Sequence, residues 1–504
     1  MSAHNSTQSP LPIEELVPTA KQCAKRIQEA DEVLLVSHID ADGLTSAGVA
    51  STMLERSATP FEAQFCKQLD EHEISQIAKT EYDTVLFTDF GSGQLDIISE
   101  YESDGAFTPI IADHHKPADA DTEYHLNPLV CSDIDGSSEL SGAGTTYVLA
   151  RAMSAVDSDS KPANEQSPSE SNKDLSAIAL VGAIGDMQGG PDGVTGANTE
   201  IVAEGVEAGV IEQHKDITLY GKQTRPVPKM LEFSTDIRIP GITGSQSGAI
   251  KFLDKCGLEL KDETGQWKHW ADLTDHEKQT VVSNLINTAI SKGVPSSRIN
   301  ELVGTTYELS EEDPRTSLRD VSEFSTLLNA TARYERADVG LAVCLGDREE
   351  ALREAKTLLQ NHQQNISQGI NWVTENGVTH EDNLQWFDSE DRIRETIVGI
   401  VAGMALGEGN ADQHTPIIAF ADKPQDNEKA ETDGEPIQEV KISARATRKL
   451  TRDGVDLSVV MGEASRSLGG DGGGHDIAAG ATIPASKRDE FISKADEILG
   501  EQLS

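Results

Sequence analysis

Aromatic and basic side chains are both scarce in this chain. Only 4% of its 504 residues are Phe, Trp or Tyr, and 42 Lys and Arg stand against 86 Asp and Glu, a formal net charge of −44. So acidic a chain could be disordered, but apolar runs and 37% hydrophobic residues indicate packed cores. Because ~1 M salt shortens the Debye length to ~3 Å, this composition suits a cytoplasmic protein of a salt-loving organism. The charge therefore excludes no class of partner, nucleic acid included.

Cysteine pairs and long apolar runs are missing as well. The five cysteines lack the spacing of a zinc site or a disulfide framework, and are Cys23, Cys66, Cys131, Cys256 and Cys344. We expect them to be small hydrophobic side chains in cores. No apolar run approaches ~18 residues and no signal peptide is recognisable, so we expect a cytoplasmic protein without a membrane span.

Strand-like and helix-like segments alternate over residues 13–150. Residues 13–28 have helical periodicity, residues 33–36 are strand-like, and residues 44–55 should form a helix directly after Gly43. This alternation predicts an α/β fold with a doubly wound parallel sheet.

Changes in composition divide the chain further. The expected parts are a catalytic domain over 13–345, a connecting helix over 346–385 and a smaller α/β domain over 386–504. Within them, residues 157–173 and 422–439 are rich in polar residues and should be loop insertions. Residues 236–320 have a mixed pattern and are expected to be a helical insertion.

Acidic and imidazole side chains gather in four stretches, each after an apolar run of strand length. The stretches are 37–43 (SHIDADG), 87–89 (FTD), 111–115 (IADHH) and 183–186 (AIGD), the last after the run 177–184. Because the carboxyl ends of parallel strands open into one crevice, we expect these groups to converge there. Their five Asp and three His would repel each other unless cations neutralised them. Mixed Asp and His ligands suit a paired Mn²⁺ or Mg²⁺ site, which is built for phosphoryl transfer.

The first and third stretches each have a simpler interpretation when taken alone. In an extended segment Asp40 and Asp42 would face one side together with His38, and Gly43 would let the chain turn into a helix. Asp-x-Asp-Gly also fits a turn or a calcium loop, and residues 113–115 also fit a turn with a helix cap. Four stretches in this order, each after a strand, favour the metal site.

These motifs resemble those of the DHH phosphoesterase superfamily, named for the triplet found here at residues 113–115. Further stretches resemble RecJ-type exonucleases of that superfamily, namely 328–333 (LNATAR), 396–402 (TIVGIVA), 443–445 (SAR) and 472–480 (GGGHDIAAG). The likeness covers most of residues 30–200 and 325–485. No segment resembles the oligonucleotide-binding barrel of bacterial RecJ, so the likeness is to the shorter archaeal, and by acidity haloarchaeal, forms.

The resemblance implies two divalent ions, Mn²⁺ or Mg²⁺, and a role for each side chain. The implied ligands are His38 and Asp40 for one ion and Asp42, His114 and Asp186 for the other, with Asp89 bridging both. His115 would orient the phosphate or transfer a proton, so the expected catalytic residues are His115 and Asp89. Asp113 would orient His114 or cap the turn. His38 stands where bacterial RecJ often has an acidic residue, which leaves the ligands of the first ion open.

Basic residues and glycines gather near the C-terminus. Residues 441–452 carry five cationic side chains and no carboxylate. This indicates either a phosphate-binding surface or a solvated basic surface without a ligand. The glycines of 469–474, with a helix expected to begin at residues 476–480, would bring backbone N–H groups close to an anion; a flexible loop is the alternative. The implied substrate-binding residues are Asn329, Arg333, Ser443, Arg445, Gly473, Gly474 and His475. The sequence is equally compatible with a structural salt bridge of Arg333.

The leading hypothesis is a metal-dependent exonuclease that removes mononucleotides from single-stranded DNA or RNA. With few aromatic side chains for stacking, recognition would depend on phosphate, metal and shape. The same centre could serve a phosphodiesterase for dinucleotides or very short RNA. A replisome scaffold is a third hypothesis; the complete ligand set disfavours a purely structural role, but binding to the GINS replication complex is compatible with activity.

Overall fold

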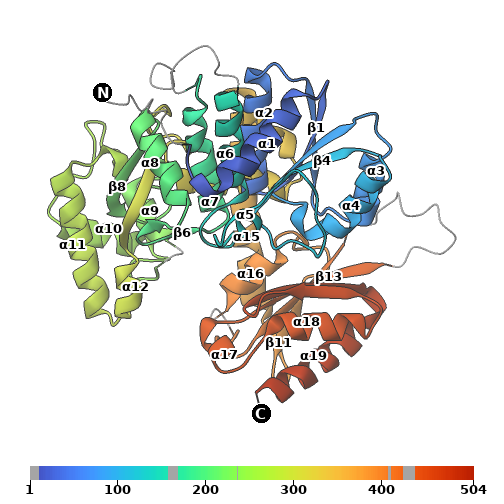
Figure 1. Ribbon diagram of the computed structural model, residues 1–504. Helices are drawn as coiled ribbons and strands as arrows, with labels where there is room; N and C mark the ends of the chain where they lie inside the picture. The colour runs from blue at the N-terminus through green and yellow to red at the C-terminus, as the bar shows by residue number, and fades with distance from the viewer. Residues whose placement is uncertain (1–10, 157–168, 235–236, 407–409, 424–437, 504) are drawn as a thin grey trace. The chain divides into compact units, whose positions relative to one another are not determined.

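The chain divides into two units, residues 1–357 and residues 358–504 (Figure 1). The computed structural model describes all residues except 1–10, 157–168, 235–236, 407–409, 424–437 and 504. Most of the two expected loop insertions, at 157–173 and 422–439, thus lies outside the described residues. Within the described residues, no helix combines the length and the apolar character needed to cross a membrane.

A five-stranded sheet lies at the centre of the first unit. All its strands run parallel, in the order β2-β1-β3-β4-β5. They are β1 (Val33–His38), β2 (Phe61–Cys66), β3 (Thr84–Thr88), β4 (Thr108–Ala112) and β5 (His125–Leu126). In β1, Val33 and Leu35 belong to one core, and Leu34 and Val36 belong to the other. Because both faces are buried, the strands are continuous apolar runs, and the doubly wound parallel sheet expected from the sequence is confirmed.

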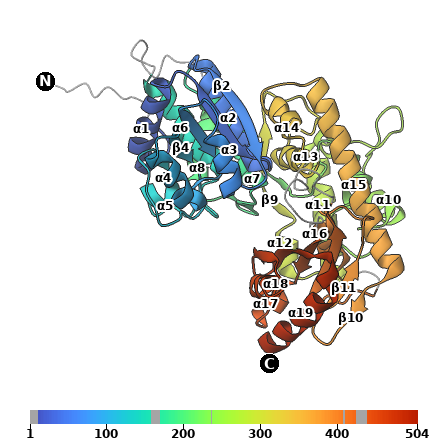
Figure 2. The same cartoon turned by 90° about the vertical axis from the view of Figure 1, so that its right-hand side faces the viewer.

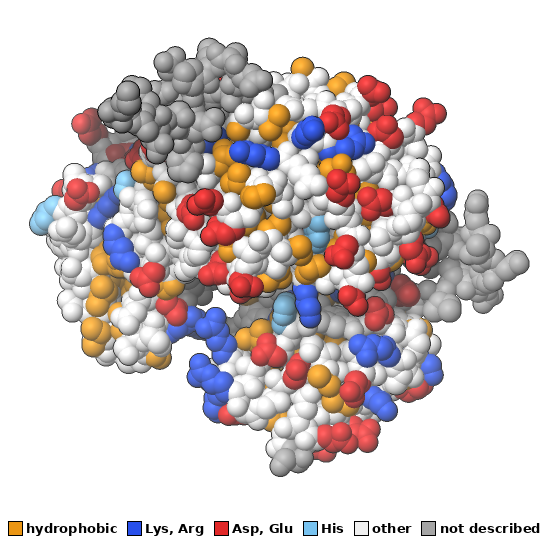
Figure 3. All heavy atoms as spheres, in the orientation of Figure 1, with side chains coloured by type: hydrophobic (Ala, Val, Ile, Leu, Met, Phe, Trp, Pro, Cys, Tyr) orange, Lys and Arg blue, Asp and Glu red, His pale blue; other side chains and the backbone are white. Residues whose placement is uncertain are grey.

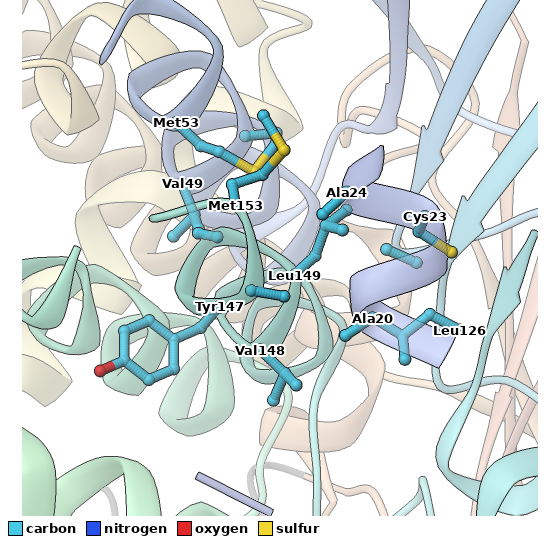
Figure 4. Close-up of a cluster of buried hydrophobic side chains, with 14 of the residues drawn as sticks. Ala20, Cys23, Ala24, Val49, Met53, Leu126, Tyr147, Val148, Leu149 and Met153 are labelled. Carbon is cyan, nitrogen blue, oxygen red and sulfur yellow. The ribbon is translucent and has the colours of Figure 1, made fainter. Parts of the chain in front are cut away.

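Helices cover both faces of this sheet. One face carries α1 (Val17–Gln28), α2 (Ala41–Arg56) and α6 (Gly142–Val156); the other carries α3 (Glu71–Ile77) and α4 (Leu95–Ser103). The side chains between α1, α2 and α6 are mostly small or aliphatic, with Tyr147 as the one aromatic ring drawn among them (Figure 4). Small side chains let these helices approach one another closely, which fits the low aromatic content. Cys23 and Cys66 are buried, and all five cysteines, each within the described residues, are free.

The fourth apolar run is a helix, so the strand predicted at residues 177–184 is wrong. It forms α7 (Ser176–Gly185), which packs against α2, α6 and α13 (Val321–Arg333). A helix with neighbours on several sides has no polar face, and a short apolar run cannot then be distinguished from a buried strand. Asp186 consequently follows the end of a helix.

An insertion follows α8 (Asn198–Ala208). It is framed by an antiparallel pair, β8 (Ile211–Ile217) and β9 (Val303–Leu309). Between these strands lie α9 (Val227–Glu232), α10 (Gln246–Lys255), α11 (Asp275–Ser291) and α12 (Ser296–Asn300). They have their own core, in which Trp270 is fully buried and donates a hydrogen bond to Asp216 (3.0 Å).

Buried polar groups join this insertion to α13. Lys222 Nζ lies 2.9 Å from Asp320 Oδ2, and both side chains are buried. The carboxylate of Glu323 accepts hydrogen bonds from the backbone N–H of Gln223 and from the hydroxyl of Thr224. Burial, and then the charge of Asp320, raises the pKa of Glu323 to about 7.

We expect Glu323→Gln to flatten the pH dependence of stability between pH 4.5 and 7. Because the pKa is about 7 in the folded protein and 4.5 ordinarily, the stability contributed by this group is fully present below pH 4.5 and is lost as the pH rises through 7. The loss is on the order of 3 kcal/mol. Denaturant unfolding of both proteins at pH 5 and 8 measures it. Glu311→Gln, at an exposed position, is the matched control and should keep the wild-type pH dependence; the same dependence in Glu323→Gln would contradict the prediction.

The second unit contains a mixed six-stranded sheet of order β10-β11-β12-β13-β15-β14. Its strands are β10 (Thr379–His380), β11 (Gln385–Asp388), β12 (Ile417–Asp422), β13 (Glu439–Arg445), β14 (Asp471–Gly474) and β15 (Ala478–Pro484). One face carries α16 (Val398–Ala405), and the other carries α18 (Leu457–Arg466) and α19 (Arg488–Gln502). The expected connecting helix is α15 (Glu350–Asn376), which is unbroken and contains the boundary between the units (Figure 2). It is shorter than the predicted 346–385, because the chain leaves the helix after Asn376 and forms β10 at residues 379–380.

The glycine-rich segment is a β-hairpin, so the helix predicted to begin at residues 476–480 is wrong. Gly472 pairs with Ala481, and Gly473 pairs with Gly480. A side chain at Gly472 would come within 2.7 Å of the Met461 carbonyl oxygen in α18. The small residues thus let β14 lie directly on α18, and no helix N-terminus is available there to bind an anion.

Candidate metal centre

The strand order of the first unit creates a crevice between β1 and β3. The chain leaves β1 for β2 on one side, whereas β3 lies on the other side of β1. Connections that diverge in this way leave an opening at the carboxyl ends of the strands, where open α/β sheets bind ligands. β1 ends at His38, β3 is followed by Asp89, and β4 is followed by residues 113–115.

The loop after β1 turns into a helix earlier than the sequence suggested. Asp40 is the N-cap of α2 and accepts a hydrogen bond from Gly43 N (3.0 Å). Asp42 lies in the first helical turn, so the extended segment predicted for Asp40 and Asp42 is wrong. A side chain at Gly43 would come within 2.2 Å of the His38 carbonyl oxygen, and only glycine lets α2 begin this close to β1. Asn329 Oδ1 in α13 accepts a hydrogen bond from Ala41 N (3.2 Å), which anchors the same loop.

The six residues that the resemblance implied as ligands lie together in this crevice. Their atoms form two groups, each within 4.8 Å: His38, Asp40 and Asp89, and then Asp42, His114 and Asp186. His38 Nδ1 lies 3.2 Å from Asp40 Oδ1 and 3.6 Å from Asp89 Oδ2. His114 Nε2 lies 3.3 Å from Asp89 Oδ1 and 3.7 Å from Asp42 Oδ2. Asp89 thus contacts one member of each group.

Asp89 has a backbone conformation that residues other than glycine rarely adopt. Its φ is 61°, in the left-handed region, and such residues concentrate at functional sites. Its carboxylate is almost fully buried, and no described residue donates a hydrogen bond to Oδ1. A side chain at Gly142 would come within 2.4 Å of that oxygen, and one at Gly182 within 2.5 Å of Asp42 Oδ1. Glycines therefore keep space around two buried carboxylates, as a cation site requires.

Backbone and amide groups orient the second group of ligands. Asp42 accepts hydrogen bonds from Gly142 N (2.7 Å) and Ala143 N (3.0 Å) at the start of α6, where the helix dipole also favours negative charge. Asp186 accepts a hydrogen bond from Gln188 Nε2 (2.9 Å). The sequence did not indicate Gln188 or Gly142, because a single glutamine or glycine beside a motif carries no distinctive pattern.

Burial, together with neighbouring charges, shifts the pKa values of these groups. Burial, followed by the charge of Asp89, raises the pKa of Asp42 well above its usual range. Burial also raises the pKa of Asp186 to about 6, against the opposing charge of His114. For His38 burial alone would lower the pKa, but Asp40 and Asp89 outweigh it and raise the value to about 10. The site thus favours added positive charge, and its carboxylate oxygens and imidazole nitrogens fit divalent cations.

The two histidines of the triplet have different partners. Asp113 Oδ1 accepts hydrogen bonds from His115 Nδ1 (2.8 Å) and from the backbone N–H of His114 (2.7 Å). The ring of His114 instead donates from Nδ1 to the carbonyl oxygen of Gly136 (2.7 Å). Asp113 therefore caps the turn and orients His115, and the predicted orientation of His114 by Asp113 is wrong.

A buried network supports this turn. Ser92 N donates to Asp113 Oδ2 (2.9 Å), and Ser92 Oγ lies 2.9 Å from His125 Nε2. Asn127 Nδ2 donates to Ser92 Oγ and to the carbonyl oxygen of His115 (2.9 Å each). Sequence reasoning missed Ser92, His125 and Asn127; the pair Asn127-Pro128 after a short strand was the available signal.

The remaining predicted residues lie in α13 and in the second unit. Arg333 is exposed at the end of α13. Ser443 and Arg445 end β13, and Arg445 Nη1 donates to the carbonyl oxygen of Ala444 (2.8 Å). A side chain at Gly399 of α16 would come within 2.4 Å of Arg445 Nη2, so this glycine makes room for the guanidinium group. His475 is exposed directly after Gly473 and Gly474 of β14.

Three domain families match the sequence. They are the DHH family, N-terminal domain, at residues 32–183, the DHH-CID domain at 219–303 and the DHHA1 domain at 386–501. An uncharacterized protein of Methanocaldococcus jannaschii is 29% identical over 499 residues, which cover 97% of this chain and 98% of that protein.

Solved structures share the fold. RecJ from Thermus thermophilus in complex with Mn²⁺ matches with a TM-score of 0.57 and 15% identity, over 98% of this chain and 56% of that one. This chain thus spans little more than half of the RecJ chain. CDC45 from Entamoeba histolytica matches with a TM-score of 0.62 and 10% identity, over 96% of this chain and 99% of that one. The three matching domains together span most of the chain and support a DHH-superfamily protein, and its fold is RecJ-like.

Proposed function

We propose that this protein is a metal-dependent phosphodiesterase that removes mononucleotides from the end of single-stranded DNA or RNA. The observation that carries the proposal is the pair of ligand groups with Asp89 between them. The proposed ligands are His38, Asp40 and Asp89 for one ion, and Asp42, Asp89, His114 and Asp186 for the other, with Mn²⁺ or Mg²⁺ as the ions. When bound, such ions lower the pKa of a water and neutralise charge on the phosphate.

The side chains around the ligands would position the substrate and move a proton. Hydrogen bonding of His115 Nδ1 to Asp113 leaves Nε2 to contact a phosphate oxygen or the leaving group. The side chain of His115 is 55% exposed, whereas those of Asp113 and His114 are buried, so His115 is the member of the triplet that a substrate can reach. The two backbone N–H groups that hold Asp42 fix its carboxylate before any ligand arrives.

Assays on end-labelled oligonucleotides test this proposal. DNA and RNA of two to thirty nucleotides would be incubated with Mn²⁺ or Mg²⁺ at high KCl. We expect mononucleotide products from one end of long strands. Hydrolysis confined to dinucleotides would favour the short-substrate phosphodiesterase. No hydrolysis by protein shown to bind metal would favour a scaffold, for which the CDC45-like fold is the supporting observation.

Arg445→Ala is expected to weaken substrate use while leaving metal binding unchanged. A guanidinium group grips phosphate oxygens bidentately, and its loss should raise the Michaelis constant about tenfold to hundredfold. His475→Ala should have the same kind of effect. Steady-state kinetics and Mn²⁺ titration by calorimetry are the measurements. Lys494→Ala, at an exposed site on α19, is the control. Weakened Mn²⁺ binding in Arg445→Ala would contradict its assignment to the substrate.

A further inference from the structure

The DHH-CID segment, residues 219–303, differs in charge from the rest of the chain. It contains 11 of the 42 Lys and Arg residues but only 10 of the 86 Asp and Glu residues. The excess of acid thus lies entirely outside this segment. An acidic surface repels polyanions. A surface on which cations balance the carboxylates can bind a polyanion where those cations are exposed.

Two cations of this segment lie on aromatic rings. Arg225 Cζ is 4.7 Å from the ring centroid of Tyr220 and 5.6 Å from that of Phe233, and Lys229 Nζ is 5.2 Å from the Phe233 centroid. In the part of the chain that the structure describes, neither cation has a carboxylate within 4.0 Å. Arg315, by contrast, pairs with Asp272 at 2.6 Å. In so acidic a chain, two cations without carboxylate partners remain available to another anion.

The backbone beneath Arg225 is shaped to hold it. Gly221 has φ +97°, and a side chain there would come within 2.6 Å of Arg225 Cδ. Glycine is therefore required both for the backbone conformation and for the path of the arginine side chain. Phe233 is 49% exposed although it is a large apolar residue. A positioned guanidinium group, an exposed ammonium group and an exposed ring thus lie within one small surface.

We propose that this surface, formed by Tyr220, Arg225, Lys229 and Phe233 and called the Arg225 surface below, binds single-stranded nucleic acid. The guanidinium and ammonium groups match backbone phosphates, and the exposed part of the Phe233 ring offers an aromatic surface against which a base can pack. An acidic protein segment would satisfy the cations but would leave the exposed part of the Phe233 ring uncovered. The inference rests on the proposed function in that the strand bound here is the class of substrate proposed for the metal centre.

Binding of a labelled strand to the full-length protein tests the inference. Fluorescence anisotropy would follow a 30-nucleotide oligothymidine in EDTA, so that no hydrolysis is needed for a signal. We expect the double variant Arg225→Glu/Lys229→Glu to raise Kd at least tenfold and to reduce its dependence on KCl. Phe233→Ala should raise Kd about tenfold without changing the salt dependence, because stacking involves no counterion release.

A second pair of cations in the same segment supplies the control. Lys292 and Arg298 are exposed at the end of α11 and in α12, and Arg298 pairs with Glu301 (2.8 Å). Lys292→Glu/Arg298→Glu makes the same change in charge on residues that are not part of the Arg225 surface. This control should change Kd less than twofold. Arg225→Gln/Lys229→Gln, which reverses no charge, should weaken binding by an intermediate factor, and melting curves establish that each variant is folded.

The outcomes separate this inference from the proposed function. Loss of binding in EDTA supports the Arg225 surface even if the metal centre hydrolyses nothing. Equal Kd values for wild type, the Arg225 variants and the control would overturn the inference. A second result would also overturn it: the Arg225 variants bind oligothymidine as the wild type does but no longer bind labelled polyglutamate. That pair of results would assign the surface to an acidic protein partner.

Discussion

Asp89→Ala is expected to abolish hydrolysis while the first unit remains folded. Asp89 is 3.6 Å from His38 in one ligand group and 3.3 Å from His114 in the other, so its removal should weaken both proposed ion sites at once. Losing a single electrostatic contact in an active site costs about 10²–10³ in rate, and a shared ligand should cost at least the upper value. Rates on labelled oligonucleotides and calorimetric titration with Mn²⁺ measure the two effects separately.

Two variants make this test specific. Asp89→Asn removes the charge but keeps a residue that tolerates a φ of 61°, so it should lose activity without backbone strain. Asp96→Asn makes the same chemical change at an exposed position on α4 and should behave as wild type. Wild-type hydrolysis by Asp89→Ala, after contaminating nuclease has been removed, would exclude the two-ion proposal.

The free energy of unfolding is expected to fall steeply when salt is withdrawn. Carboxylates are scattered over the face in Figure 3, and the net charge of −44 makes them repel one another. The Debye length grows from ~3 Å at 1 M salt to ~10 Å at 0.1 M, so this repulsion reaches several neighbouring side chains at low salt. A loss of a few kcal/mol would lower the melting temperature of a unit of this size by about 5 °C.

Melting curves across a KCl series from ~0.1 M to molar concentrations measure this effect. Mn²⁺ should raise the melting temperature in part at low salt, because a ligand that binds only the folded state stabilises it. In Asp89→Ala, Mn²⁺ should raise the melting temperature much less. That result would show that Mn²⁺ stabilises the protein by binding at the candidate metal centre. The rate of hydrolysis expected from the proposed function should fall together with stability as salt is removed. A protein most stable and most active at low salt would contradict the interpretation of its acidic surface.

The sequence predicted the fold best at strands that are buried on both faces. β1, β3 and β4 are continuous apolar runs because helices cover both sides of the sheet, and the acidic groups after them mark the crevice at the switch point. The same feature misled at α7, since a helix buried on several sides is also continuously apolar. Local pattern therefore identifies burial more reliably than it identifies backbone conformation.

The arrangement around the triplet could not be predicted from sequence. Asp113 binds the ring of His115 and not that of His114 because Gly136, 22 residues further along the chain, occupies Nδ1 of His114. The glycines that leave space for Asp42 and Asp89 come from α6 and α7, which are still further away in the sequence. The β14–β15 hairpin, predicted as a helix start, depends on contacts of Gly472 with α18. Such contacts between distant segments leave no local signature.

The position of Trp270 in the insertion core decides how unfolding of this protein can be observed. The chain has only four tryptophans; Trp267 and Trp270 belong to the insertion, and Trp372 and Trp386 belong to the second unit. The parallel sheet and its crevice therefore contribute no indole emission. Tryptophan fluorescence will therefore report unfolding of the insertion and of the second unit. It will give no direct signal from the candidate metal centre. A single tryptophan placed beside α2 would give that centre an optical signal of its own.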